Sequence, residues 1–365
     1  MKCLAFITLI LFSLSVKAIT FEDGVFPELA TSARALAMGN AFIAKVDDAS
    51  SVFYNPAGLG TVRYAHLHLS NFHLELNKGF IASATGGKIS DAASGLPKAF
   101  SLDGTRQLLV NNVGAISHSS FHALPNFTSR FFSMGYLLSQ KTRAVVTSAT
   151  STTGFEYADR FDHGPYAALN LSLFGGIFKA GVSTIFLQRK EAIGTANPNN
   201  TINLGTSAYN KGSMINMTLG GKITFPFVFL PTFAATAHNA LDKNFSGARG
   251  AGNPTKIPRS YDVGFSITPQ IGTSTRIHLE VDYKDLGSAY SGISSTRKML
   301  IGAELDFSRV FFFRIGYGDG FGSAGLGVKS KKVEFDLTTY AVDTTSSAFR
   351  GHEDRRFALS LSSGF

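Results

Sequence analysis

The histidines are the residues whose spacing most readily suggests chemistry. His66 and His68 are two positions apart, so on a β-strand both imidazoles face the same side, where they could bind a transition metal. A zinc site needs at least three protein ligands, and no clear third ligand accompanies this pair. His118 and His122 form a second, equally incomplete pair. We therefore expect these histidines to belong to strand surfaces, and we predict no metal site.

A run of alternate glycines imitates a phosphate-binding loop. It consists of Gly316, Gly318, Gly320 and Gly322. A dinucleotide fingerprint needs a helix directly after its glycines, whereas this run follows a strand pattern and no helix pattern comes after it. The glycines are better explained as space for a bend or for the close approach of another segment. We predict no cofactor.

Neither enzymatic chemistry nor nucleic-acid binding has support in the sequence. Membrane-edge hydrolases need a nucleophile, a base and an orienting group, and no persuasive set is present, so we predict no catalytic residue. Basic residues outnumber acidic ones by 34 to 25. They are scattered and not clustered, so we expect no nucleic-acid partner and place many of them at a membrane rim facing anionic lipid.

The elements that must position these residues are strands. Apolar residues alternate with small, polar or charged ones in Ile215–Phe225, Tyr261–Ile267 and Ile277–Tyr283. Such alternation gives each strand one apolar and one polar face. Many segments run about ten residues, as membrane-crossing strands require, whereas globular strands average about five to six. The pattern predicts an all-β fold, a transmembrane antiparallel β-barrel.

The connections between strands alternate in length, as in outer-membrane barrels. Short links are expected at Phe174–Gly176, Phe225–Phe227, Pro269–Thr273, Phe307–Arg309 and Ser330–Lys331. Long links are expected at Lys190–Lys211, Asn239–Pro258, Gly287–Ser295 and Asp343–Asp354, and the short Gly318–Phe321 link is an exception. We predict about 14 strands, or 16 if Val62–Phe72 and Lys78–Gly86 both span the membrane.

The two faces of the predicted barrel differ in composition. Tryptophan is absent, so the lipid-facing aromatic belt must come from Phe and Tyr, as in Phe311, Phe313 and Tyr317. Charges of both signs occupy the inward register, which predicts a filled lumen of paired charges. They are Arg276, Glu280, Asp282, Lys284, Lys298, Glu304, Asp306, Arg314, Glu334, Asp336 and Arg356.

The composition fits an exported barrel protein. Only 16% of the residues are charged, against about 25% in soluble domains. Lys2 followed by the apolar stretch Leu4–Val16 predicts a signal peptide over residues 1–18, cleaved after Ala18. The single cysteine, Cys3, lies within that peptide, so no disulfide is expected. We expect the protein in the cell outer membrane.

The segment before the barrel has a different pattern. Thr31–Val46 is rich in alanine and predicts a helix that Ser32 could cap, and Asp47–Ser50 ends it. Pro56 excludes helical geometry at the residue before it. We assign residues 19–60 to a plug within the lumen and residues 61–365 to the barrel; an arm packed outside the barrel is the alternative.

This segment carries a resemblance. The run Ala33–Phe42, the acidic Asp47–Ser50 and the run Tyr54–Leu59 resemble the N-terminal signature of the FadL/TodX-type superfamily of outer-membrane transporters for hydrophobic compounds, and PorV-like barrels within it. The resemblance covers about thirty residues. It implies a plug, or hatch, in a fourteen-stranded barrel, with an Asn-Pro-Ala element at Asn55, Pro56 and Ala57. The terminal Phe365 resembles the signal that the barrel assembly machinery recognises.

Two functions follow as hypotheses. In the first, the barrel binds or transports hydrophobic, long-chain fatty acid-like molecules and releases them sideways into the membrane. Candidate plug contacts for such a molecule are Leu36, Met38, Phe42, Phe53 and Leu59, although simple packing of the plug is the preferred explanation for each of them. In the second, a PorV-like barrel hands secreted proteins to a partner complex. The expected partners are outer-membrane lipids, the assembly machinery, and a hydrophobic small molecule or a secreted protein.

Overall fold

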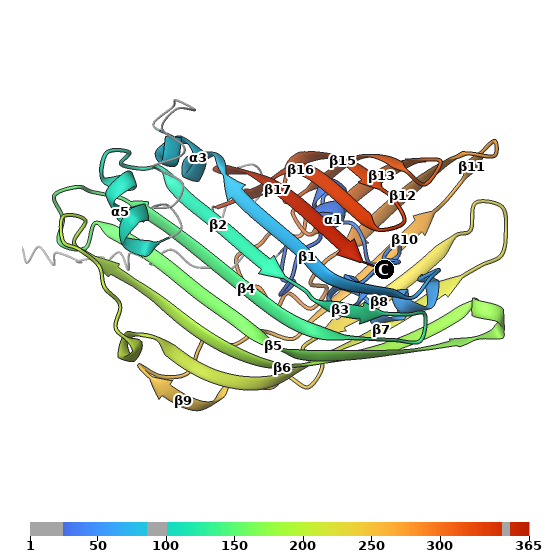
Figure 1. Cartoon of the computed structure of the whole chain (residues 1–365), viewed down its shortest axis with the longest axis horizontal. Coiled ribbons are helices and arrows are strands. Elements are labelled where there is room, and N and C mark those ends of the chain that lie inside the picture. The colour runs from blue at the N-terminus through green and yellow to red at the C-terminus, as the bar shows by residue number, and fades with distance from the viewer. Residues whose placement is uncertain (1–24, 86–100, 345–350, 365) are drawn as a thin grey trace, which may run out of the picture.

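The chain forms a closed β-barrel with its N-terminal segment inside (Figure 1). The computed structural model describes residues 25–85, 101–344 and 351–364. Every pairing of neighbouring wall strands is antiparallel, and the first strand pairs with the last, from His68–Gly364 to Asn77–Arg356. This closure leaves no open sheet edge whose N–H and C=O groups would face hydrocarbon unpaired.

In the described residues, seventeen strand segments make fourteen wall strands. β2 and β3 both pair with β1 and β4, β8 and β9 both pair with β7, and β10 and β11 both pair with β12, so 17 − 3 = 14. The bounds are β1 His66–Asn77, β2 Ile116–Ala123, β3 Asn126–Thr128, β4 Phe132–Val146, β5 Phe155–Leu173, β6 Phe178–Ala196, β7 Asn210–Thr224, β8 Thr232–His238, β9 Ser246–Gly250, β10 Ser260–Ile267, β11 Gln270–Ile271, β12 Thr275–Tyr283, β13 Met299–Phe307, β14 Phe311–Gly318, β15 Phe321–Lys329, β16 Val333–Asp343 and β17 Glu353–Gly364. The predicted fold class and count of 14 are confirmed.

The option of sixteen strands was wrong. Lys78–Thr85 is the helix α3, and Leu102–Val110 is the helix α5. Ser101 caps α5 by accepting from the N–H of Gly104. These helices belong to the link between β1 and β2, which falls on the side of the long loops. The alternation of short and long links is confirmed, and so is its predicted exception, the tight β14–β15 turn at Asp319 and Gly320.

The alternating faces of the strands are confirmed. Along β14, Phe311, Phe313 and Ile315 are 49%, 52% and 65% exposed, while Arg314 between them is buried. The outer face is therefore apolar and aromatic over this strand. The predicted inward charges are buried or partly buried, and many are paired, as Arg314 is with Glu304 and Asp336.

The plug, residues 25–62, fills the lumen. None of these residues is exposed, and the segment contacts β5, β6, β7 and β14 to β17 from inside. It contains the helices α1 Ala33–Ala37 and α2 Ser51–Tyr54 and the 3₁₀ helix η1 Pro56–Thr61. It therefore lies within the barrel and not beside it.

The predicted helix over Thr31–Val46 was largely wrong. α1 covers only five residues, and Ser32 makes no capping hydrogen bond through its side chain. Gly39 and Asn40 have φ of 66° and 67°, which ends the right-handed helix. Beyond them the backbone N–H groups are taken by carboxylates of the wall, which replace the hydrogen bonds of further helical turns.

Some predictions fall outside the described residues. These are the signal peptide at 1–18, with Cys3 and the cleavage after Ala18, and the terminal Phe365. Within the described ranges, no helix is both long and apolar enough to cross a membrane.

Candidate functional site

Two carboxylates of the barrel wall hold the irregular part of the plug. Asp282 of β12 accepts hydrogen bonds from the N–H groups of Phe42 and Ile43 at 2.7 and 3.1 Å. Glu280, two positions earlier on the same face, accepts from the N–H of Ala44 at 2.6 Å and of Lys45 at 3.3 Å. Four successive backbone donors that no helix satisfies are thereby paired.

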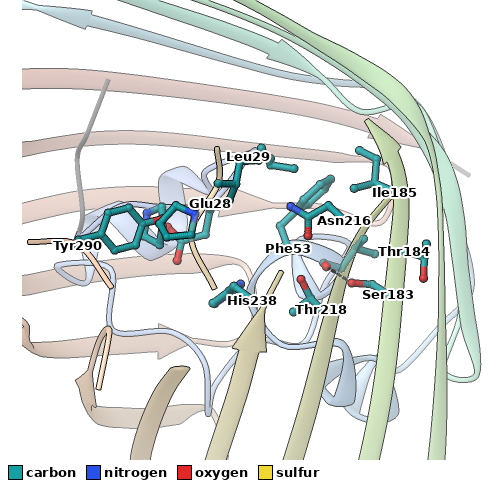
Figure 2. Close-up of a pocket in the computed structure, with 14 residues that line it drawn as sticks. Glu28, Leu29, Phe53, Ser183, Thr184, Ile185, Asn216, Thr218, His238 and Tyr290 are labelled. Carbon is teal, nitrogen blue, oxygen red and sulfur yellow. Dashed lines mark hydrogen bonds between the residues drawn. The ribbon is translucent and has the colours of Figure 1, made fainter. Parts of the chain in front are cut away.

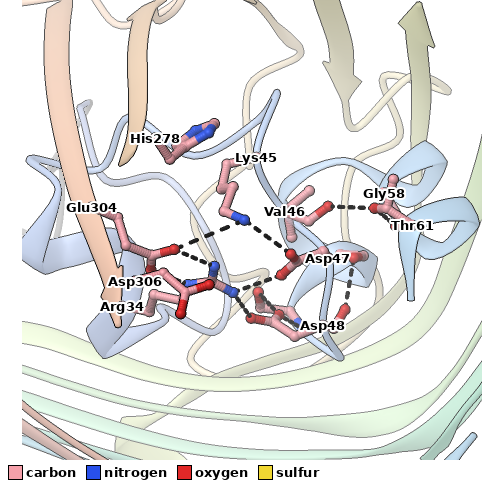
Figure 3. Close-up of polar contacts among 12 residues, drawn as sticks. Arg34, Lys45, Val46, Asp47, Asp48, Gly58, Thr61, His278, Glu304 and Asp306 are labelled. Carbon is pink, nitrogen blue, oxygen red and sulfur yellow. Dashed lines mark hydrogen bonds and ion pairs between the residues drawn. The ribbon is translucent and has the colours of Figure 1, made fainter. Parts of the chain in front are cut away.

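A buried ionic network joins the plug to Glu304 of β13 (Figure 3). Through Glu304 it continues to Arg314 of β14. Arg34 donates to both oxygens of Glu304, through Nε at 2.8 Å and Nη2 at 2.9 Å, and through Nη1 to Asp47 at 2.6 Å. Lys45 reaches Asp47 at 3.1 Å, and Arg314 donates to Glu304 at 2.8 Å. Bidentate hydrogen bonds between a guanidinium and a carboxylate fix the orientation of both groups and also neutralise their charges.

The network shifts the titration of the plug residues. Burial alone would raise the pKa of the Asp47 carboxyl, but Arg34 and Lys45 together bring that pKa well below its ordinary value. Burial, followed by the charge of Glu28, raises the pKa of Tyr54 well above its ordinary value. Tyr54 is therefore a neutral phenol, which donates to Asn40 at 2.9 Å and accepts from the N–H of Ser32 at 3.2 Å.

The Asn-Pro-Ala element lies against bare backbone of the wall. Asn55 donates to the carbonyl oxygen of Ile43 at 3.0 Å, and its own side-chain oxygen accepts from the N–H of Ala57 at 3.0 Å. A Cβ added to Gly181 of β6 or Gly220 of β7 would overlap Pro56 or Asn55. Glycines in the wall thus let this part of the plug approach the strands closely.

The alternate glycines of β14 serve the same purpose. A Cβ on Gly316 would overlap the backbone of Met38, and one on Gly318 would overlap that of Gly39. Conversely, a Cβ on Gly39 would lie 2.6 Å from backbone atoms of Tyr317. The interpretation of these glycines as room for a close approach is confirmed at Gly316 and Gly318, whereas Gly320 forms the β14–β15 turn with φ of 89°.

A narrow cavity lies beside the plug, towards the long loops (Figure 2). The empty space between its atoms, open solvent included, is about 480 Å³. The volume that the centre of a water molecule can occupy is about 30 Å³. It is lined by Pro27, Glu28, Leu29, Val52, Phe53, Ser183, Thr184, Ile185, Asn216, Thr218, His238, Ile257, Pro258 and Tyr290. Burial, and then Asp262 and Glu28, raise the pKa of Tyr290, so its hydroxyl is neutral.

The wall next to this cavity is interrupted. The β5–β6 ladder pairs His163 with Gln188 and Tyr166 with Ile185, but it has no pairs at Gly164 and Pro165 between them. Proline has no N–H to donate to a ladder. On the inner side, Tyr166 meets Phe53 edge to face at 5.4 Å, and Ile185 lines the cavity. The cavity therefore lies behind the weakest stretch of this ladder.

Of the eight plug residues predicted as a site, only Phe53 lines the cavity. Leu36, Met38, Phe42 and Leu59 are fully buried in the plug's hydrophobic clusters. Asn55, Pro56 and Ala57 form the close contact with the wall described above. Sequence reasoning missed Ile185, Asn216 and Thr218; their inward register on β6 and β7 was readable, but not their depth in the barrel.

The histidine pairs lie on the strands β1 and β2. His66 and His68 stack on one face of β1 at 5.6 Å. His118 lies 3.6 Å from Glu75, and His122 stacks on His73 at 4.4 Å. In the described portions of the chain, no group of three or more His, Cys, Asp or Glu side chains is arranged to hold a metal ion.

The fold is similar to that of solved hydrocarbon channels and transporters. No family model matches the sequence, and no curated protein sequence does. Among solved structures, the CymD monoaromatic hydrocarbon channel is similar over 93% of this chain and 99% of its own, with TM-score 0.55 and 9% identity. The toluene transporter TodX of Pseudomonas putida is similar over 93% of this chain and 98% of its own, with TM-score 0.52 and 9% identity. The toluene transporter TbuX of Ralstonia pickettii is similar over 92% of this chain and 98% of its own, with TM-score 0.51 and 14% identity.

These similarities confirm the predicted resemblance to FadL/TodX-type barrels at the level of the fold. They do not bear on a PorV-like branch, which stays a prediction.

Proposed function

We propose that the protein is an outer-membrane channel that binds hydrophobic molecules from outside and passes them sideways into the bilayer. The observation behind this proposal is the position of the cavity. It extends from the long loops at Ile257 and Tyr290 to Phe53, behind the interrupted ladder at Gly164 and Pro165. A lumen filled by the plug favours a lateral exit over an axial one.

The cavity limits the class of cargo. Its small volume favours a single aromatic ring or one acyl chain over a whole two-chain lipid. The solved structures of similar fold include a monoaromatic hydrocarbon channel and toluene transporters, which supports a small apolar cargo. Long-chain fatty acids remain within the proposal because a single extended chain has a similar cross-section.

A pair of neighbouring substitutions on β7 tests the cavity. Thr218 lines it, whereas Leu219 points outward and is 44% exposed. We expect Thr218→Phe to fill the cavity and to weaken the binding of toluene or oleate at least tenfold. We expect Leu219→Phe to keep the affinity within twofold of the unaltered protein. Equilibrium dialysis with a radiolabelled probe measures both affinities. Absence of saturable binding to the unaltered protein, or equal loss in both variants, would contradict the proposal.

A second candidate function is a PorV-like interaction protein for secreted proteins. The narrowness of the cavity and the buried ion pairs that fix the plug favour a barrel through which nothing passes. The partner would bind the long outer loops predicted at Lys190–Lys211 and Asn239–Pro258, of which residues 197–209, 239–245 and 251–259 lie outside the strands. Affinity purification of the unaltered protein and of a variant with both loops shortened distinguishes the two functions. The interaction function predicts that the unaltered protein retains a stoichiometric partner, that the shortened variant loses it, and that neither protein binds toluene.

A further inference from the structure

A second cavity lies at the opposite end of the plug, among the short turns. It is lined by Gly60, Thr61, Val62, Arg63, Tyr64, Arg130, Gly175, Gly176 and Lys179. The centre of a water molecule can reach about 490 Å³ within it, far more than in the cavity beside Phe53. Its walls come from the end of the plug, the β3–β4 turn and the β5–β6 turn.

The charged side chains that line this cavity are all positive. Three of the nine lining residues are cationic, and none is acidic. Within the described ranges, no carboxylate lies within ion-pairing distance of Arg63, Arg130 or Lys179. In the network around Arg34, by contrast, each guanidinium meets a carboxylate. Cations gathered in a concave site without counter-ions attract and concentrate anions.

The lysine of this set is held in place by the fold. Lys179, at the start of β6, is 4% exposed. Its side chain lies against the bare backbone of Gly60, where an added Cβ would be 2.7 Å from the lysine Cδ. Its ammonium donates to the carbonyl oxygen of Gly176, which leaves two of its three N–H donors for a ligand. A surface lysine would be neither buried nor fixed in this way.

The two arginines line the cavity and are exposed to solvent. Arg63 follows the plug directly, and Arg130 brings its guanidinium to the β5–β6 turn, where an added Cβ on Gly176 would lie 3.6 Å from it. Burial, together with Arg309 and Arg276, lowers the pKa of Arg63, as expected in a region with excess positive charge. Planar guanidinium groups suit the bidentate binding of carboxylate and phosphate oxygens.

The rim of the cavity is apolar. Phe131, next to Arg130, is 67% exposed, and Phe174, next to Gly175, is 79% exposed; Tyr64 is 71% exposed. Short turns of such barrels lie at the periplasmic face, where exposed aromatic side chains sit at the level of lipid head groups. A ligand with an anionic head and an apolar tail matches both the positive interior and this rim.

We propose that this cavity is a binding site for the oxyanion head of an amphiphile, a phosphate or carboxylate, on the periplasmic side of the barrel. Lys179 and the two arginines bind the oxygens, and the tail lies along the aromatic rim. The head group can come from a phospholipid of the inner leaflet or from a free anionic amphiphile. The site does not depend on transport through the other cavity, so it can exist even if the proposed function fails.

The absence of tryptophan supplies a probe for this site. Tyr64→Trp places a single indole at the rim, and its fluorescence can be titrated with dodecyl phosphate, inorganic phosphate, dihexanoyl phosphatidylglycerol and dihexanoyl phosphatidylcholine. We expect saturable responses to the anionic amphiphiles that weaken at high salt, and at least tenfold weaker affinity when Lys179→Met is added. Arg130→Gln, at an exposed position, is the second variant, in case the buried lysine is needed for folding. Lys331→Gln, on another short turn, is the matched control.

The outcomes separate the sources of the anion. Tighter binding of the anionic amphiphiles than of inorganic phosphate supports the proposal, and the relative affinities for phosphatidylglycerol and dodecyl phosphate indicate which source is preferred. Equal affinity for phosphate and dodecyl phosphate would mean that the tail makes no contact with the rim, and would overturn it. A lack of saturable response to any anion, an equal response to phosphatidylcholine, or the same affinity in the Lys179, Arg130 and Lys331 variants overturns it.

Discussion

At the scale of single residues, the plug depends on a small number of buried charges. Glu304 is the centre of the network, since it accepts from Arg34 through both oxygens and from Arg314 through one. Removing one member of such a group leaves buried charge without compensation, which costs far more than losing an exposed pair.

Replacing Glu304 by glutamine tests this role. We expect Glu304→Gln to lower the free energy of unfolding by about 3–5 kcal/mol, because Arg34 and Arg314 lose their shared counter-ion. Glu334→Gln is the control: Glu334 pairs with Lys329 at 2.7 Å, whose side chain is 38% exposed, and such pairs contribute about 0–1 kcal/mol. Urea unfolding of the two variants in phospholipid vesicles measures both changes in the free energy of unfolding. Similar decreases in the two variants would show that the network around Glu304 is no more important than an exposed ion pair.

The Asp47 carboxyl makes the plug sensitive to acid. Because its pKa in the folded protein lies below the unfolded value, its contribution to stability is present at neutral pH and is lost as the pH falls below about 4. The contribution is moderate, since 31% of the side chain is exposed and solvent screens its charge. We expect plug residues to become increasingly protease-sensitive as the pH falls below about 4, and Asp47→Asn to weaken this dependence. An unchanged pH profile in the variant would contradict this prediction.

At the scale of elements, β5 and β6 are the longest strands of the wall, yet their ladder is interrupted. On the other side of β5 the β4 ladder is continuous through Gly164 and Pro165. A Cβ on Gly164 would overlap the carbonyl oxygen of Phe186, so the glycine is needed for the two strands to lie this close. The interruption is therefore built into the sequence of one interface of the wall.

A cross-link at the interruption tests lateral release. Pro165→Cys with Phe186→Cys joins β5 to β6 at the missing pairs, and Leu171→Cys with Ala180→Cys joins the same strands where the ladder is regular. We expect oxidation of the first pair to slow toluene uptake into proteoliposomes at least tenfold and reduction to restore it. Oxidation of the second pair leaves uptake unchanged. Equal rates for the two oxidised proteins would exclude an exit at Pro165.

At the scale of the whole molecule, the apolar outer face decides where the barrel can reside. Leu279, in the middle of β12, and Ile271, in the hairpin between β10 and β12, both point outward with 41% and 56% exposure. A barrel in a membrane places these two side chains at different depths. Only the first then lies within hydrocarbon.

Arginine scanning measures that depth. We expect Leu279→Arg to cost about 2–4 kcal/mol and Ile271→Arg about 0–1 kcal/mol when unfolding is followed in phospholipid vesicles, since a charge is most costly near the bilayer midplane. Equal costs at the two positions would mean that the band around Leu279 does not face lipid.

Much of the barrel was predictable because its information is local. Alternation within Ile277–Tyr283 states which face of β12 is apolar, and closure then follows from the cost of unpaired edges. The plug was harder to predict, because Asp282 and Glu280 accept from the N–H groups of residues 42–45 and so override the helical propensity of an alanine-rich run. The cavity was hardest, since Phe53, Ile185 and Tyr290 meet only after the barrel closes.

The links between plug and wall also set an order of events during assembly. The plug is synthesised first, but its partners come late: 240 residues separate Phe42 from Asp282, 270 separate Arg34 from Glu304, and 305 separate Ala33 from Thr338. Contacts this distant along the chain form slowly because a large loop must close before they are made. The plug therefore stays unpaired, either solvated or bound by a chaperone, until nearly all of the wall strands have been synthesised.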